Sequence, residues 1–215
     1  MAQKDLPKNY ERIECSLVLI DLSGFTQLLY SAAVKEEVMR TVVMAMTRLF
    51  EESVRAAEGA SDIQIINTTG DGFIAIAKGK TPSRTALRYA LEIKSHFQQY
   101  VRSLIHSVPF RQRVDLRIAL HHGEVYEIHI DGLGDKGYPL YIGDDINLIA
   151  RVINSQVARR TGIALTRAFY RRLMMSTKEP PPADEVILDR NRYPEPVEIY
   201  KLPTEIPEPK KAKKP

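Results

Sequence analysis

The sequence predicts an α+β fold in which helices pack against a central, mainly antiparallel sheet. Two patterns lead to this class. Apolar residues alternate with the period of a strand in some segments and recur every three or four positions, as in a helix, in others. The strands also come largely in hairpin pairs, whereas a parallel α/β sheet alternates single strands with helices. The predicted order is β-α-β-β-α-β-β-α-β-α-β-β, within one domain at residues 13–202.

The first half of the chain supplies three strands and two helices. The apolar run CSLVLI at 15–20 is typical of a buried strand, and a loop begins at Asp21. Apolar residues at helical spacing predict a long amphipathic helix over 34–59. Two strands then flank the turn TTGDG at 68–72, because Asp-Gly is favoured in tight turns, and a second helix spans 87–105.

The second half begins with strands. Apolar and polar residues alternate over 114–120 and again over 126–130, and Gly123 between them predicts the turn of a second hairpin. A glycine-rich loop follows, and residues 144–153, DDINLIARVI, predict a helix before a strand, a helix and two strands complete the body. The tail at 203–215 has too little apolar surface to offset the entropy of ordering, so we expect it to be flexible.

Composition narrows the class of protein. The chain has 215 residues, with 31 Lys and Arg against 27 Asp and Glu. The tail holds four of the lysines, so the body carries little of the basic field that nucleic-acid binding needs. No apolar run approaches a membrane span, and the first residues lack the apolar region of a signal peptide. We therefore expect a cytoplasmic protein that inserts into no membrane and binds no nucleic acid.

Two aspartates form the first candidate site. Asp21 follows a buried strand and precedes Gly24, and Asp71 lies in the hairpin turn. Taken alone, Asp21 is interpreted as a helix cap and Asp71 as a turn residue. Taken together, two carboxylates at the ends of neighbouring strands could bridge two divalent cations, because Mg²⁺ and Mn²⁺ bind such oxygens along with substrate phosphates.

Asn147 and Arg151 form the second candidate site. Their i, i+4 spacing places an amide and a guanidinium on one face of the predicted helix. Taken alone, such a pair belongs to a solvated helical face. Ile146, Ile149 and Ile153 occupy the opposite stripe, which faces the core and leaves the polar pair available to a cleft.

Other polar residues of the strands are given structural roles. His121 and His122 are neighbours on a strand, so their side chains point to opposite faces and do not easily chelate one metal ion. Arg111, Arg113 and Arg117 alternate with apolar residues and are interpreted as the solvent side of a strand.

Four segments in a fixed order make the chain recognisable. They are DLSGFT at 21–26, TTGDGFIA at 68–75, LRIALHHGEV at 116–125 and GDDINLIARV at 143–152, and they resemble the motifs of the class III nucleotidyl cyclase catalytic domain. The resemblance implies the class III cyclase fold, with a ferredoxin-like core similar to the palm of nucleotide polymerases. It also implies a head-to-tail homodimer with two composite sites.

The resemblance also implies roles for individual residues. Asp21, the backbone carbonyl of Leu22, and Asp71 would bind two metal ions, Mn²⁺ or Mg²⁺. Asn147 and Arg151 would reach the same site from the other subunit. There Asn147 would orient the ribose, and Arg151 would stabilise charge on the α-phosphoryl group.

The resemblance further identifies nucleotide-binding positions. Phe25 and Thr26 would lie against the triphosphate. Adenylate cyclases of this class have a lysine and often an aspartate at the two base-selecting positions, and guanylate cyclases typically have a glutamate and a cysteine, but this chain has Asn67 and Leu140. Leu140 offers no hydrogen bond, so a purine edge facing it would lose about 1 to 3 kcal/mol. Asn67 donates and accepts, which suits uracil or, after an amide flip, cytosine.

This departure makes the chain similar to the pyrimidine cyclases of bacterial Pycsar antiphage systems. Those enzymes make cyclic UMP or cyclic CMP, favour Mn²⁺, and signal through a separate effector. We expect UTP to be converted to 3′,5′-cyclic UMP and pyrophosphate. A cytidylate cyclase, an adenylate or guanylate cyclase, and an inactive nucleotide-binding domain are the alternatives. Arg190 and Arg192 stand where the family has a phosphate-binding lysine.

Overall fold

The computed structural model describes residues 10–32, 36–60, 62–106, 114–130, 138–174, 184–186 and 197–202. The strands are β1 (Tyr10–Ser23), β2 (Ile63–Thr68), β3 (Gly72–Ala77), β4 (Asp115–Ile130), β5 (Tyr138–Ile142), β6 (Ile163–Thr166), β7 (Asp184–Val186) and β8 (Val197–Tyr200). The helices are α1 (Phe25–Ala32), α2 (Glu36–Glu58), α3 (Pro82–His96), the π-helical turn η1 (Phe97–Val101), α4 (Arg102–His106), α5 (Asp144–Val152), α6 (Gln156–Thr161) and α7 (Arg167–Met174). The expected flexible tail at 203–215, with Arg111, Arg113, Arg190 and Arg192, lies outside the described residues.

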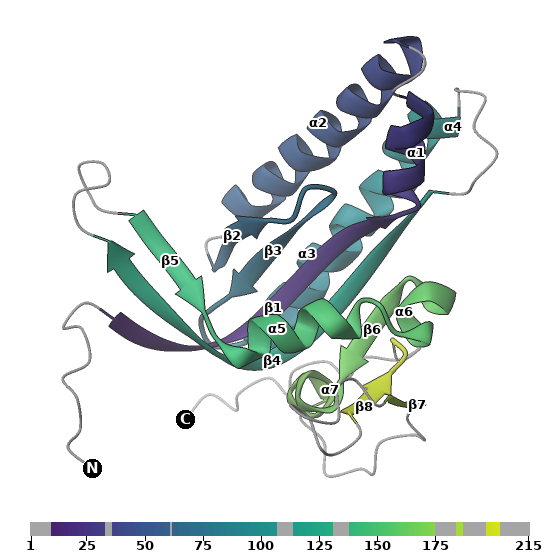
Figure 1. The fold of residues 1–215 in the computed structure, drawn as a ribbon. Helices are drawn as coiled ribbons and strands as arrows, with labels where there is room; N and C mark the ends of the chain where they lie inside the picture. The colour runs from purple at the N-terminus through teal and green to yellow at the C-terminus, as the bar shows by residue number, and fades with distance from the viewer. Residues whose placement is uncertain are drawn as a thin grey trace, which may run out of the picture.

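The strands form one mixed sheet around a long central pair. Their order is β2-β3-β1-β4-β6-β8-β7, and β5 also pairs with β4 (Figure 1). Among the described pairs only β4 and β6 run parallel, so the predicted α+β class with a mainly antiparallel sheet is confirmed. β1 and β4 pair along their length, from Tyr10 opposite Ile128 to Ser23 opposite Asp115.

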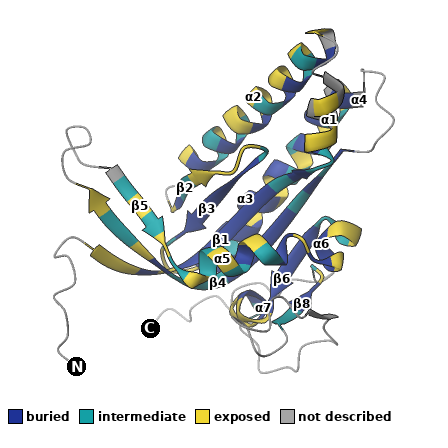
Figure 2. Ribbon diagram, viewed as in Figure 1, coloured by how far each residue is buried: buried dark blue, intermediate teal, exposed yellow. Residues whose placement is uncertain are grey.

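Each face of the sheet carries its own apolar core, because successive side chains of a strand point to opposite faces. Val18 and Ile20 of β1 pack with α2, α3 and α7, whereas Leu17 and Leu19 pack with α5 and α6. Figure 1 shows α3 behind the sheet and α5 in front of it. Figure 2 shows that β1, β3 and β4 are buried where these layers meet.

The helix predicted over 34–59 is confirmed as α2. It buries an apolar stripe at helical spacing and exposes its other side, as its alternating colours in Figure 2 show. None of the described helices is long and apolar enough to cross a membrane.

The predicted hairpin turn at Gly123 is wrong, because β4 continues through this residue. Gly123 lies opposite Cys15 in the β1–β4 ladder, and the long β1 offers it a partner throughout. A Cβ atom on Gly123 would stand 2.1 Å from Oδ2 of Asp145 in α5. The glycine therefore allows a helix to approach the strand closely, and the second hairpin is formed by β4 with β5 instead.

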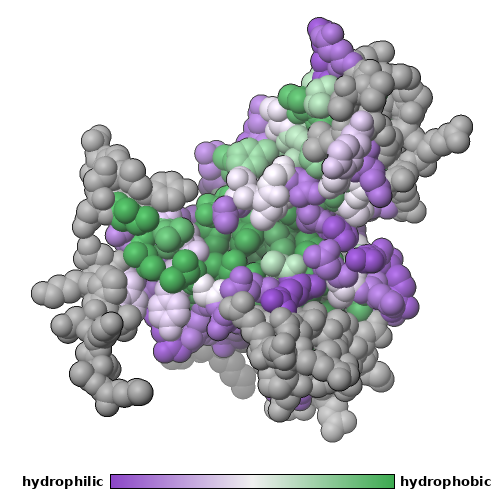
Figure 3. Space-filling model, viewed as in Figure 1, coloured by the Kyte–Doolittle hydropathy of each residue, from purple (hydrophilic) through white to green (hydrophobic). Residues whose placement is uncertain are grey.

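The β4–β5 hairpin extends from the body and exposes apolar side chains. Tyr126, Ile130, Leu140 and Ile142 are 38% to 46% exposed. In Figure 3 apolar side chains gather on the front of the molecule, over the region of β5 and the neighbouring strands. A contiguous apolar patch of this kind is typical of a surface that another protein covers.

Candidate active site

The backbone brings the two predicted carboxylates together. Asp21, near the end of β1, lies opposite Gly72 of β3, directly after Asp71 in the β2–β3 turn. A Cβ on Gly72 would stand 2.0 Å from the Ile20 carbonyl oxygen, so only glycine permits this approach. The Leu22 N–H donates to the Asp71 carbonyl at 3.2 Å.

The ionisation of Asp71 is affected by its neighbour Asp21. Burial raises the pKa of Asp71, and the neighbouring charge and hydrogen bonding of Asp21 raise it further. Arg117 acts in the opposite direction on the same pKa. Two neighbouring carboxylates, of which Asp71 is made harder to ionise by burial and by Asp21, form a site that favours a bound positive charge.

Arg117 is a site residue that the sequence interpretation missed. It lies opposite Asp21 in the β1–β4 ladder, and its Nε donates to Asp21 Oδ2 at 3.0 Å. Its Nη2 forms an ion pair with the same oxygen, and its Nη1 donates to Asn154 Oδ1 at 3.4 Å. The solvent-side interpretation of Arg117 is therefore wrong: its side chain is 16% exposed and faces the carboxylates. The register between two distant strands, which no local pattern reveals, was the missing information.

The donor set of this site fits a divalent cation completed by its substrate. Among the described residues no group of three or more His, Cys, Asp and Glu side chains could hold a metal ion. The described part of this site offers two carboxylates beside the backbone of Leu22, whose N–H donates to the Asp71 carbonyl. This incomplete oxygen set is typical of Mg²⁺ or Mn²⁺ bound with nucleotide phosphates.

Helix α5 carries the second predicted pair. Ile149 and Val152 are buried against the sheet, Arg151 is half-buried, and the exposed Asn147 donates to the Gly143 carbonyl at 3.3 Å. The chain just after α5 reaches the carboxylates, through Asn154 and Arg117. Asn147 stands five residues before the end of α5 at Val152, which is about 8 Å of helix.

The predicted nucleotide-binding residues lie in two places. Phe25, the first residue of α1, is 8% exposed and its ring packs in the core. Only its backbone could therefore contact a phosphate. Thr26 is exposed. Asn67 and Leu140 are exposed on β2 and β5. Gln64 Nε2 donates to the Tyr141 hydroxyl at 2.7 Å, which joins these two strands near the two positions.

One cavity lies next to Arg117 at the carboxylate site, and a larger one lies away from the site. The first is polar, with a volume of about 240 Å³, and Lys94, Arg102, Arg159 and Arg160 add positive charge to its wall. Burial lowers the pKa of Lys94, whose Nζ donates to the Thr161 carbonyl at 3.2 Å. This cavity can accept an anion.

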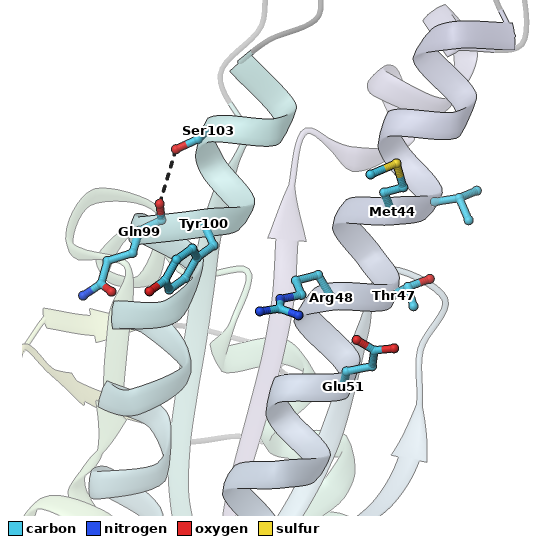
Figure 4. Close-up of a pocket in the computed structure, with 8 residues that line it drawn as sticks. Met44, Thr47, Arg48, Glu51, Gln99, Tyr100 and Ser103 are labelled. Carbon is cyan, nitrogen blue, oxygen red and sulfur yellow. Dashed lines mark hydrogen bonds between the residues drawn. The ribbon is translucent and has the colours of Figure 1, made fainter.

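A larger, apolar cavity of about 630 Å³ lies between α2 and η1. Figure 4 shows Arg48 and Met44 facing Tyr100 across it, and Ser103 donating to the Gln99 carbonyl. The cavity contains none of the predicted site residues.

Comparisons with known proteins agree with this geometry. A family model described as "Adenylate and Guanylate cyclase catalytic domain" matches residues 8–201. A search of curated proteins finds no match.

Solved cyclase structures share the fold. The adenylyl cyclase CyaB from P. aeruginosa superposes with a TM-score of 0.69 at 16% identity, covering 89% of this chain and 94% of its own. The guanylate cyclase domain of RhGC from Catenaria anguillulae in complex with GTP gives 0.63 at 18%, with 88% and 96% covered. A dimeric guanylyl cyclase domain of RhoGC from Blastocladiella emersonii gives 0.61 at 15%, with 89% and 96% covered.

Proposed function

The chain belongs to the adenylate and guanylate cyclase catalytic domain family, and on this premise we propose that it is a uridylate cyclase. The substrate is UTP, and the products are 3′,5′-cyclic UMP and pyrophosphate. In this reaction the ribose 3′-oxygen bonds to the α-phosphorus as the bond from that phosphorus to the β-phosphate oxygen breaks. The 3′-hydroxyl proton is released, and pyrophosphate leaves.

The observation that carries the proposal is the meeting of Asp21 and Asp71 at the end of the central strands. Enzymes of this class use divalent cations, and here the two carboxylates and the Leu22 carbonyl would hold Mn²⁺ or Mg²⁺, two ions per site. When bound, such ions favour ionisation of the 3′-hydroxyl and neutralise the departing pyrophosphate.

Asn147 and Arg151 complete the site from a second subunit. Asn147 orients the ribose, and Arg151 stabilises charge that grows on the α-phosphoryl group, so its loss lowers kcat more than it raises KM. A homodimer with two composite sites is supported by the apolar patch of Tyr126, Leu140 and Ile142, which a second copy would cover.

The choice of base rests on Asn67 and Leu140. Both are exposed in a single chain and lie on strands that the Gln64–Tyr141 hydrogen bond joins. An amide that donates and accepts matches a pyrimidine edge, and an apolar side chain leaves a purine edge unpaired. CTP is the second candidate, because the amide of Asn67 suits cytosine after a flip.

The resemblance to antiphage cyclases supports a proposed role for the product in the cell. Cyclic UMP would act as a second messenger that a separate effector recognises. Measuring cyclic nucleotides before and after phage infection tests this role. A rise in cyclic UMP supports it, and a constant level contradicts it.

Incubation of the purified chain with Mn²⁺ and each of the four nucleoside triphosphates tests the proposed activity. Mass spectrometry should detect cyclic UMP as the main product, and Asp71→Ala should make none. Cyclic CMP as the main product would move the assignment to CTP. ATP or GTP as the best substrate would overturn the pyrimidine assignment, and no cyclic product at all would favour the inactive alternative.

A further inference from the structure

The edge of β4 has a gap in its strand pairing on one side. β6 pairs with residues 118–120 of β4, and β5 pairs with residues 126–130. Within the described part of the chain, no strand pairs with β4 on this side between them. A backbone N–H left without a partner in such a gap costs free energy, so another group must accept it.

Asp145 fills this gap from the first turn of α5. Its Oδ2 accepts the Glu124 N–H at 2.7 Å, and its Oδ1 lies 3.0 Å from Nε2 of His121. The approach depends on Gly123, whose missing Cβ leaves room for the carboxylate. The helix has no side-chain cap at Gly143, and Asp145 attaches its first turn to the strand by a hydrogen bond.

His121 is itself held from the other side. The residue is 5% exposed, and its Nδ1 lies 2.8 Å from the Thr166 hydroxyl at the end of β6. That hydroxyl also accepts the Phe169 N–H of α7 at 3.4 Å. A continuous polar chain thus connects α7 and β6 through His121 to the start of α5.

The charge of Asp145 is maintained by this contact. Burial raises the pKa of Asp145, but the contact with His121 and the hydrogen bond from Glu124 outweigh it, so the pKa stays below its ordinary value. His122, on the opposite face of β4, contributes weakly in the same direction. The carboxylate therefore stays ionised at neutral pH.

We propose that His121 and Asp145 are positioning residues that fix the first turn of α5 and thereby the orientation of Asn147 and Arg151. Asn147 follows Asp145 by two residues, and Arg151 by six, on a short helix whose other end continues to Asn154 at the carboxylate site. The inference rests on the proposed cyclase function of that site. A tilt of α5 by about 1 Å at Asn147 can cost about 100-fold in rate, because reacting groups must stay aligned.

The kinetics of Asp145 variants, measured with the best substrate of the wild-type chain, test the inference. Asp145→Ala should lower kcat about 10-fold or more with KM within about 2-fold, since the substrate still binds but is misaligned. Asp145→Asn, which keeps an acceptor for the Glu124 N–H, should recover part of the loss. Asp144→Asn removes a charge from the same turn at an exposed side chain, and it should keep wild-type kcat.

A double variant and hydrogen exchange separate positioning from general stability. If His121 and Asp145 act as one unit, His121→Gln with Asp145→Ala should lose no more kcat than Asp145→Ala alone. Backbone amides of α5 should exchange about 10-fold faster in Asp145→Ala, while those of β1 and α3 stay at the wild-type rate.

Three results would overturn the inference. They are an unchanged kcat in Asp145→Ala, an equal loss in Asp144→Asn, and faster exchange spread over the whole sheet. A wild-type chain without cyclase activity would refute the proposed function instead, and the local exchange of α5 would then still decide whether Asp145 fixes this helix.

Discussion

Asp21 and Asp71 illustrate how a functional site opposes stability at the scale of single residues. Burial and the charge of Asp21 raise the energetic cost of ionising Asp71, and Arg117, which pairs with Asp21, offsets only part of it. Sites that bind cations commonly keep such unfavourable charge in the unbound protein. The repulsion should therefore be measurable as lost stability.

Replacing Asp71 by asparagine should stabilise the metal-free chain while it removes activity. A neutral amide of the same shape ends the repulsion with Asp21, so the Tm should rise by about 2 °C at neutral pH. Thermal unfolding in a chelating buffer, with a parallel cyclase assay, measures both effects. Glu58→Gln, an exposed charge loss on α2, is the control and should change neither quantity. A lower Tm for Asp71→Asn would contradict the repulsion.

The pKa of Asp145 gives a pH dependence with a definite sign. Because the folded protein holds this pKa below its ordinary value of 3.8, the carboxylate stabilises the fold above that pH. The contribution is lost as pH falls through the lowered folded pKa. The Tm of the wild type should exceed that of Asp145→Asn by a constant amount from mildly acidic to mildly basic pH, and the difference should shrink below about pH 4. A Tm difference between the wild type and Asp145→Asn that grows on acidification would be inconsistent with a lowered pKa of Asp145.

At the scale of elements, β2 and β5 meet through a hydrogen-bonded network. Gln64 donates to the Tyr141 hydroxyl, which also bonds to the Glu127 carboxylate, and Lys78 and His129 pair with Glu127. Burial and Glu127 together raise the pKa of Tyr141, so the phenol remains a donor at physiological pH. The network fixes the spacing of the strands that carry Asn67 and Leu140.

Removing the Tyr141 hydroxyl should therefore weaken base selection. Tyr141→Phe keeps the ring but removes the hydrogen bond from Gln64 that joins β5 to β2. The ratio of kcat/KM for UTP to kcat/KM for ATP should therefore fall about 5- to 10-fold. Tyr100→Phe, which removes an exposed hydroxyl on η1, serves as the control and should keep the wild-type ratio. Equal ratios for Tyr141→Phe and the wild type would show that the spacing of these strands does not govern selectivity.

Sequence patterns predicted the elements whose signal lies within a single strand, helix or turn. The stripe of α2 and the Asp-Gly turn before β3 are local signals, and both elements formed as expected. The turn predicted at Gly123 was wrong because the sequence does not distinguish a glycine that forms a turn from one that lets a helix approach a strand closely. The pairing of Arg117 with Asp21 depends on the register of strands far apart in sequence, which composition and periodicity do not contain.

At the scale of the whole molecule, the apolar patch on the β4–β5 hairpin supports the proposed homodimer. Ile142 is 46% exposed and Leu140 is 41% exposed, and both precede α5, whose Asn147 and Arg151 the proposal assigns to the site of a second subunit. Ile142→Asp places a charge in that interface, which a dimer cannot bury without a partner. The variant should sediment as a folded monomer and lose at least about 10-fold in activity. An active monomer would contradict the composite site.

Complementation between two inactive chains tests the composite site most directly. In a mixed dimer of Asp71→Ala and Arg151→Ala, one site receives both defects and the other receives none. Equal mixtures, after exchange of subunits, should regain about a quarter of wild-type activity, because half of the dimers are mixed and each has one intact site. If each site is built within one chain, the mixture will stay as inactive as either variant alone.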